Sequence, residues 1–72
     1  MSRPSAIEVT INGASHQFED APSVNDLLAR LGLAGKRVAL ERNGEIVPRS
    51  RFADVRIAQG DRIEIVVAVG GG

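Results

Sequence analysis

The residues with the clearest chemical potential are the three glycines at the end of the sequence, Gly70, Gly71 and Gly72. Glycine lacks a Cβ atom and loses the most conformational freedom on ordering, so a run of glycines adds nothing to a core. Such a run does make a thin segment that can enter a narrow channel. We therefore expect Gly72 to present a reactive carboxylate, with Gly70 and Gly71 threading into a partner's active site. The alternative is an inert end, as many chains have.

The side chains offer little chemistry of their own. The sequence contains no cysteine and one histidine, His16, which argues against a thiolate nucleophile and against a zinc site. No serine, histidine and carboxylate are spaced as a catalytic triad, and the lysine of a phosphate-binding loop is missing. We expect no catalytic residue and no metal site, and we interpret His16 as a structural histidine on the same strand face as Phe18.

Length and charge limit the classes of function that remain. A chain of 72 residues forms one small domain, and its nine basic and nine acidic residues cancel. Nucleic-acid binding is disfavoured, because there is no basic field and only two aromatic side chains could stack on bases. No apolar run approaches the roughly twenty residues of a membrane span, and residues 1–5 do not form a secretion signal. These features predict a soluble cytoplasmic protein.

Strand periodicity marks both ends of the chain. Apolar residues alternate with polar ones over residues 6–12, and Asn12-Gly13 then predicts a tight hairpin turn into a second strand at 15–19. Shorter strands are expected near residues 38–41 and 46–47, followed by a loop with one helical turn at 49–55. Residues 62–69 form the most strand-like segment, with Ile63, Ile65, Val67 and Val69 expected on the inner face.

One amphipathic helix is predicted over residues 23–31. Ser23 is a favourable N-cap, and Asp26 stands three residues later in the first turn. An apolar stripe follows at helical spacing, and Gly32 is placed to end the helix in a left-handed conformation. The helix should therefore pack by one face against the sheet.

The order of these elements predicts an α+β fold of the β-grasp (ubiquitin-like) type. We expect a mixed four- to five-stranded sheet with its first and last strands adjacent and the main helix on one face. The predicted division is a disordered lead at residues 1–5, the domain at 6–69 and a flexible glycine tail at 70–72. Val66 and Ala68 leave the outer face of the last strand apolar, which favours a partner-docking patch over plain strand propensity.

Three stretches of the sequence resemble the ThiS family, the sulfur carriers of bacterial thiamine biosynthesis. They are ERNGEIVPRS at residues 41–50, GDRIEIV at 60–66 and the terminal VGGG. The similarity covers residues 6–72, and the combination is more specific than the glycine tail, which other ubiquitin-like carriers share.

The resemblance implies a carrier without an active site of its own. A ThiF-like adenylyltransferase would use ATP and magnesium to adenylate Gly72, with no cofactor bound by the carrier itself. Sulfur from a cysteine desulfurase would then give a C-terminal thiocarboxylate, which a ThiG-like thiazole synthase would take into the thiazole ring. Arg42, Arg49 and Arg51 are candidates for partner contacts, although ordinary solvated charges are the preferred interpretation.

Two other functions remain open at this point. A MoaD-like carrier of another pathway would share the fold and the tail chemistry but have a different acceptor enzyme. A non-catalytic β-grasp interaction module would bind partners through its sheet, and its tail would never be adenylated. The ERNGEIVPRS stretch argues against the first, and deletion of Gly72 separates the second from a carrier.

Overall fold

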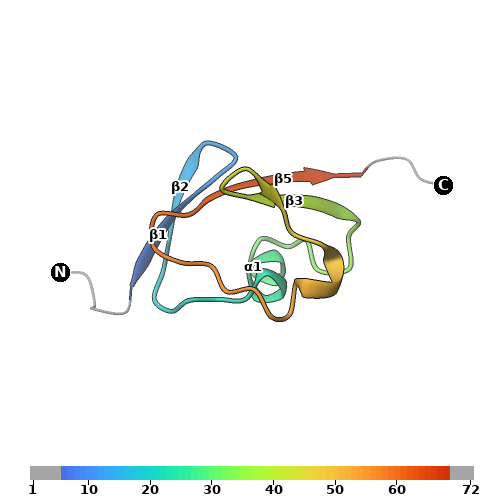
Figure 1. Ribbon diagram of the computed structural model, residues 1–72. Coiled ribbons are helices and arrows are strands. Elements are labelled where there is room, and N and C mark those ends of the chain that lie inside the picture. Colours follow the sequence, from blue (N-terminus) through green and yellow to red (C-terminus); the bar gives the residue numbers. More distant parts are fainter. Residues whose placement is uncertain (1–5, 69–72) are drawn as a thin grey trace.

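In the computed structural model, which describes residues 6–68, a five-stranded mixed sheet curves over a single α-helix (Figure 1). The expected lead at residues 1–5, Val69 and the tail at 70–72 lie outside the described residues. The sheet order is β2-β1-β5-β3-β4, so the first and last strands are adjacent, as predicted. The elements in chain order are β1 (Ile7–Ile11), β2 (Ala14–Phe18), α1 (Val24–Arg30), β3 (Val38–Arg42), β4 (Glu45–Ile46), the 3₁₀ helix η1 (Arg49–Arg51) and β5 (Arg62–Val67).

The two hairpins turn where the sequence predicts. Asn12 and Asn43 both have positive φ, 50° and 53°, and each is followed by a glycine that also has positive φ. Positive φ at both central residues matches the twist of a two-residue hairpin. These turns set the antiparallel registers Ile11↔Ala14 in the first hairpin and Arg42↔Glu45 in the second.

The first and last strands lie side by side in the centre of the sheet and run parallel. Two residue pairs, Thr10↔Arg62 and Ile11↔Ile63, form their ladder. The side chain of Asn12 then extends it: its Nδ2 donates to the carbonyl of Ile65 at 3.1 Å, and its Oδ1 accepts from the Ile65 N–H at 2.7 Å. The side-chain amide of Asn12 thus makes the two hydrogen bonds to β5 that the backbone of β1 cannot make, because the chain has already turned toward β2.

Helix α1 begins and ends as its sequence predicts. The Ser23 hydroxyl accepts a hydrogen bond from the Asp26 N–H at 3.1 Å, which satisfies one of the free donors of the first turn. At the other end Gly32 has φ 76°, and its N–H donates to the Ala29 carbonyl. The Leu33 N–H donates to the Leu28 carbonyl, which closes the helix.

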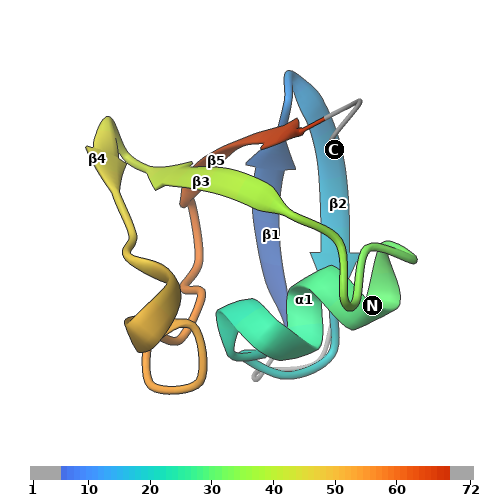
Figure 2. The ribbon, with the colours of Figure 1, turned by 90° about the vertical axis from the view of Figure 1, so that its right-hand side faces the viewer.

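The core lies between the inner face of the sheet and the apolar stripe of α1 (Figure 2). The segment after β4 closes the open side of this layer, with Phe52 buried and Val55 half-buried as expected. The buried apolar residues are Val9, Ile11, Val24, Leu27, Leu28, Leu40, Val47, Phe52, Ile57, Ile63 and Ile65.

Val67 lies on the expected face of β5 but is not buried there. It is 37% exposed, although it alternates in phase with the buried Ile63 and Ile65. The pairing explains this difference, because β1 pairs with only the first two residues of β5 and leaves Val67 with a neighbour, Val38, on one side alone.

The strand expected at residues 46–47 is shifted by one residue in the structure, since β4 covers Glu45–Ile46 and Val47 turns into the core.

The Asn12 bridge gives the first prediction. Asn12→Gly keeps the positive φ but removes two hydrogen bonds to β5, each worth about 0.5–1.5 kcal/mol, so the free energy of unfolding should fall by about 1–3 kcal/mol. Urea denaturation followed by circular dichroism measures the change. Ser15→Ala is the control, because its hydroxyl makes one exposed bond to Glu8 in the same hairpin. Equal stability of both variants would show that the bridge contributes nothing.

Candidate functional site

The end of β5 is held by β3 as far as the last described residue. Val67 pairs with Val38, and the Ala68 N–H donates to the Arg37 carbonyl at 2.9 Å. The residues expected to react or to thread into a partner, Gly70 to Gly72, come after Val69 and lie outside the described residues. The structure therefore places the base from which the tail departs.

The predicted docking residues are exposed beside this base. Val66 is 66% exposed on the outer face of β5, opposite Ala39 of β3, and Ala68 is also exposed. Valine leaves a large apolar surface in water at this position. Binding at this patch is a prediction that the structure does not test.

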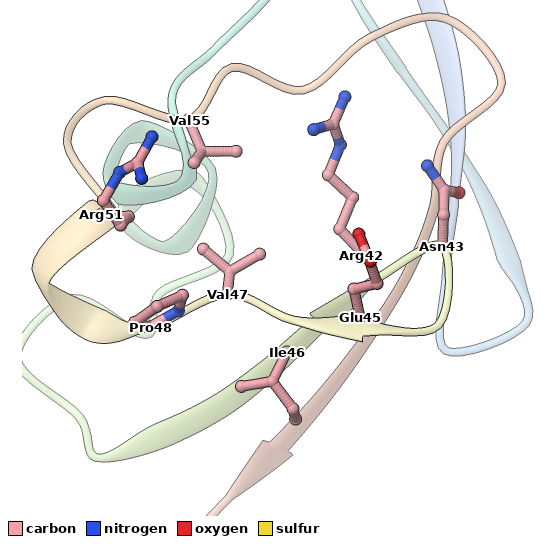
Figure 3. Close-up of a pocket in the computed structure, with 8 residues that line it drawn as sticks. All are labelled: Arg42, Asn43, Glu45, Ile46, Val47, Pro48, Arg51 and Val55. Atoms are coloured by element: carbon pink, nitrogen blue, oxygen red, sulfur yellow. The ribbon is translucent and has the colours of Figure 1, made fainter.

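Ile46 is a further exposed apolar residue that the sequence analysis did not single out. Its side chain is 64% exposed, and in Figure 3 it points to the opposite side of β4 from Val47. Because Ile46 is paired with Glu41 and Glu41 with Glu64, it shares the outer face of the sheet with Val66. The sequence could have indicated this exposure, because residues 46 and 47 are both apolar and only one of two neighbours in a strand can face the core.

The three arginines considered as partner contacts do not form one cluster. Arg42 and Arg51 line a hollow of about 320 Å³ between β4 and the segment after η1 (Figure 3). Arg49 lines a separate hollow with Lys36 and Phe52. Arg42 also has a structural role, because its Nε donates to Asp61 at 2.8 Å.

Asp61 is the most connected polar side chain of this region and is buried. Its carboxylate accepts hydrogen bonds from Arg42 Nε at 2.8 Å, from Asn43 Nδ2 at 3.0 Å and from the Ala58 N–H at 2.8 Å. Burial raises the pKa of the Asp61 carboxyl, but these hydrogen bonds and the charge of Arg42 outweigh burial and hold the pKa below its usual value. The carboxylate therefore fixes the second hairpin to the start of β5.

His16 belongs to a small cluster between β2 and α1. Its ring stacks on that of Phe18 at a centroid distance of 6.5 Å, and the Arg30 guanidinium lies 5.7 Å from the Phe18 centroid. Arg30 also forms two hydrogen bonds with Asp20, which lower the pKa of Asp20 and raise that of Arg30. The shared face of His16 and Phe18 is as predicted.

The described residues show neither of two features that would suggest a different class of protein. Among residues 6–68, no group of three histidine, cysteine or acidic residues is placed to hold a metal ion. In the same range, no helix is long and apolar enough to cross a membrane.

Comparison with known proteins identifies the family. Residues 6–72 match the model of the ThiS family. The chain belongs to this family of sulfur carriers. It is 41% identical over 63 residues to the sulfur carrier protein ThiS of Bacillus subtilis, covering 86% of this chain and 96% of that protein. Family membership confirms the predicted class, a carrier rather than an enzyme.

A solved ThiS structure confirms the fold. The crystal structure of the thiamine biosynthesis protein ThiS from Geobacter metallireducens superposes with a TM-score of 0.77 at 32% identity. The match covers 92% of this chain and all of the other (100%). The β-grasp arrangement predicted from the order of the elements is therefore the arrangement of the ThiS family.

Two similar proteins are much longer than this ThiS-family chain. They are thiazole synthases from Paramagnetospirillum magneticum, 44% identical over 66 residues, and from Magnetococcus marinus, 36% identical over 66 residues. Each match covers 92% of this chain, which spans 20% of the length of these relatives. A ThiS-like segment is thus part of a larger polypeptide in both.

The Asp61 network gives a prediction with a defined pH dependence. Asp61→Asn leaves Arg42 without a carboxylate and should lower the free energy of unfolding at pH 7 by about 2–4 kcal/mol. Because the folded-state pKa is depressed, the stabilisation is present above the unfolded value of about 3.9 and is lost as the pH falls through the folded value. The difference from the wild type should therefore shrink below about pH 4.

Urea denaturation of both proteins between pH 7 and pH 2 measures this effect. Asp20→Asn is the control, because its ion pair with Arg30 is exposed and should contribute much less. A constant difference between the wild type and Asp61→Asn across the whole pH range would contradict the depressed pKa.

Proposed function

We propose that this chain carries sulfur as a thiocarboxylate on Gly72 and delivers it for formation of the thiazole ring of thiamine. The observation that carries the proposal is the family match, which extends through residue 72 and so includes the three glycines. The hydrogen bond from the Ala68 N–H to the Arg37 carbonyl agrees with the proposal, because it attaches the last described residue to the folded domain.

The chemistry requires activation by a partner, because a carboxylate is a poor electrophile. A ThiF-like adenylyltransferase joins the Gly72 carboxylate to the α-phosphate of ATP with magnesium as its cofactor, and pyrophosphate leaves. The persulfide sulfur of a cysteine desulfurase then attacks the acyl carbon and AMP departs, which leaves an acyl disulfide. A thiol reduces this disulfide and releases the sulfur on Gly72. The product is a thiocarboxylate, and the ATP-dependent step agrees with the cytoplasmic location expected from the sequence.

The acceptor in this proposal is a ThiG-like thiazole synthase. Its support is the pair of relatives named thiazole synthase that contain a segment similar to this chain. Placing a carrier and the enzyme that consumes its sulfur on one polypeptide raises their effective concentration. In a separate carrier the same encounter depends on a docking surface.

In this mechanism the residues of the chain itself bind the partner enzyme and position the terminal carboxylate. Glycines at 70–72 lack side chains that would obstruct a narrow active-site channel. Val66 and Ala68 supply exposed apolar surface beside the base of that segment. We propose that they pack against the partner while the tail occupies its active site.

The thiocarboxylate is tested by intact-protein mass spectrometry. The chain is incubated with a ThiF-like adenylyltransferase, ATP, magnesium and a sulfide source. We expect a mass gain equal to the exchange of one oxygen for one sulfur, and no gain in a variant that lacks Gly72. An unchanged mass, with an adenylyltransferase that is active on its own carrier, would refute the proposal.

The docking role of Val66 is tested by Val66→Asn. Replacing an exposed valine with a polar residue should change the free energy of unfolding by less than about 0.5 kcal/mol. It should raise the Kd for the adenylyltransferase or the thiazole synthase about tenfold, which corresponds to about 1.4 kcal/mol. Calorimetry measures both quantities, and Gln17→Asn on edge strand β2 is the control because it is exposed and far along the sheet order. Equal affinities of the wild type, Val66→Asn and Gln17→Asn would exclude a role of Val66 in docking.

A further inference from the structure

Two carboxylates face each other across the outer surface of the sheet. Glu41 of β3 and Glu64 of β5 are directly paired in the antiparallel register, and both are exposed. Like charges at directly opposed positions destabilise a sheet. Neither glutamate forms an ion pair with another of the residues 6–68. The fold of the described residues therefore gains nothing from this arrangement.

The two carboxylates border a hollow at the turn end of the outer face. Arg62 also lines this hollow, together with Asn43, Gly44 and Gly60. Arg62 lies on the same strand face as Glu64 but is not ion-paired with either glutamate. Its backbone N–H is bound to the Asn43 side chain at 2.9 Å. The hollow thus has two negative charges and one positive charge, an excess of one carboxylate.

Apolar side chains lie on both sides of the glutamates. Ile46 is paired with Glu41 on one side, and Val66 follows Glu64 by two residues on the other. These are the two most exposed large apolar side chains among residues 6–68, at 64% and 66%. Ala39, opposite Val66, continues this apolar surface, while Arg62 and Asn43 border the glutamates toward the turn. A complementary surface has a cation next to apolar residues.

We propose that this outer face of β4, β3 and β5 binds an arginine or lysine of the thiazole synthase between Glu41 and Glu64. Ile46 and Val66 then pack against the apolar residues around that cation. The inference rests on the proposed function, which supplies the partner. An arginine fits especially well, because its planar guanidinium can donate to two carboxylates at once.

The choice of the thiazole synthase follows from the long relatives. Both contain a segment similar to this chain within a protein named thiazole synthase. The outer face is also continuous with Val66 and Ala68 at the base of the glycine segment. Docking there holds the end of β5 against the enzyme that receives the sulfur.

The test exploits opposite effects on folding and on binding. Glu41→Gln and Glu64→Gln each remove the repulsion in the free chain, so the unfolding midpoint should rise by about 1–8 °C. Each should also raise the Kd for the thiazole synthase of the same organism about tenfold and reduce the dependence of the Kd on salt. A residue with a purely structural role would not show this combination.

Glu45→Gln is the matched control. Glu45 has the same charge and lies next to Ile46 on β4, but strand alternation and its pairing with Arg42 place it on the opposite face. Calorimetric titration of the four proteins with purified thiazole synthase, at low and moderate salt, gives the affinities. Thermal unfolding gives the midpoints, and size-exclusion chromatography gives the oligomeric state of each variant.

Each outcome decides the proposal. Weaker binding by both outer-face variants, with Glu45→Gln unchanged, supports it. Unchanged binding overturns it while leaving the proposed function intact, as does a change confined to the self-association of this chain. If the wild-type chain does not bind the thiazole synthase at all, this inference and the proposed acceptor both fail.

Discussion

The parallel pairing of β1 with β5 is the constraint on which the rest of this structure depends. It joins two strands from opposite ends of the chain through only two residue pairs, and the Asn12 side chain extends it to Ile65. Strand β2 joins the sheet through β1, and β3 with β4 joins it through β5. Because loop closure over so long a segment is unfavourable, the pairing must be supported by the core that both strands share with α1.

The same pairing divides β5 into two parts with different roles. Its first residues lie between β1 and β3, next to the network of Asp61, Arg42 and Asn43. Its last residues have β3 on one side only, which leaves Val67 exposed on the inner face, while Val66 is exposed on the outer face. The strand is therefore paired on both sides where it begins and on one side only where it ends.

Much of this architecture is predictable from the sequence because its signals are local. The Asn-Gly turns, the Ser23 cap and the two-residue period of β1 and β5 each depend on a few neighbouring residues. Val67 lies on the predicted face of β5, but its exposure could not be predicted because it depends on how far β1 extends along β5. The Asp61 network and the Glu41↔Glu64 pair were missed for the same reason, since cross-strand register becomes visible only when distant strands are paired.

The outer face shows why a carrier can tolerate a sheet that is not optimal for stability. An isolated domain of this size would be more stable with a cation opposite Glu64 and with polar residues in place of Ile46 and Val66. An unpaired charge beside exposed apolar residues is unfavourable in the free chain and favourable against a complementary surface. In the arrangement we propose, partner binding compensates for what folding leaves unsatisfied, and the outer face of the sheet provides the specificity of the carrier.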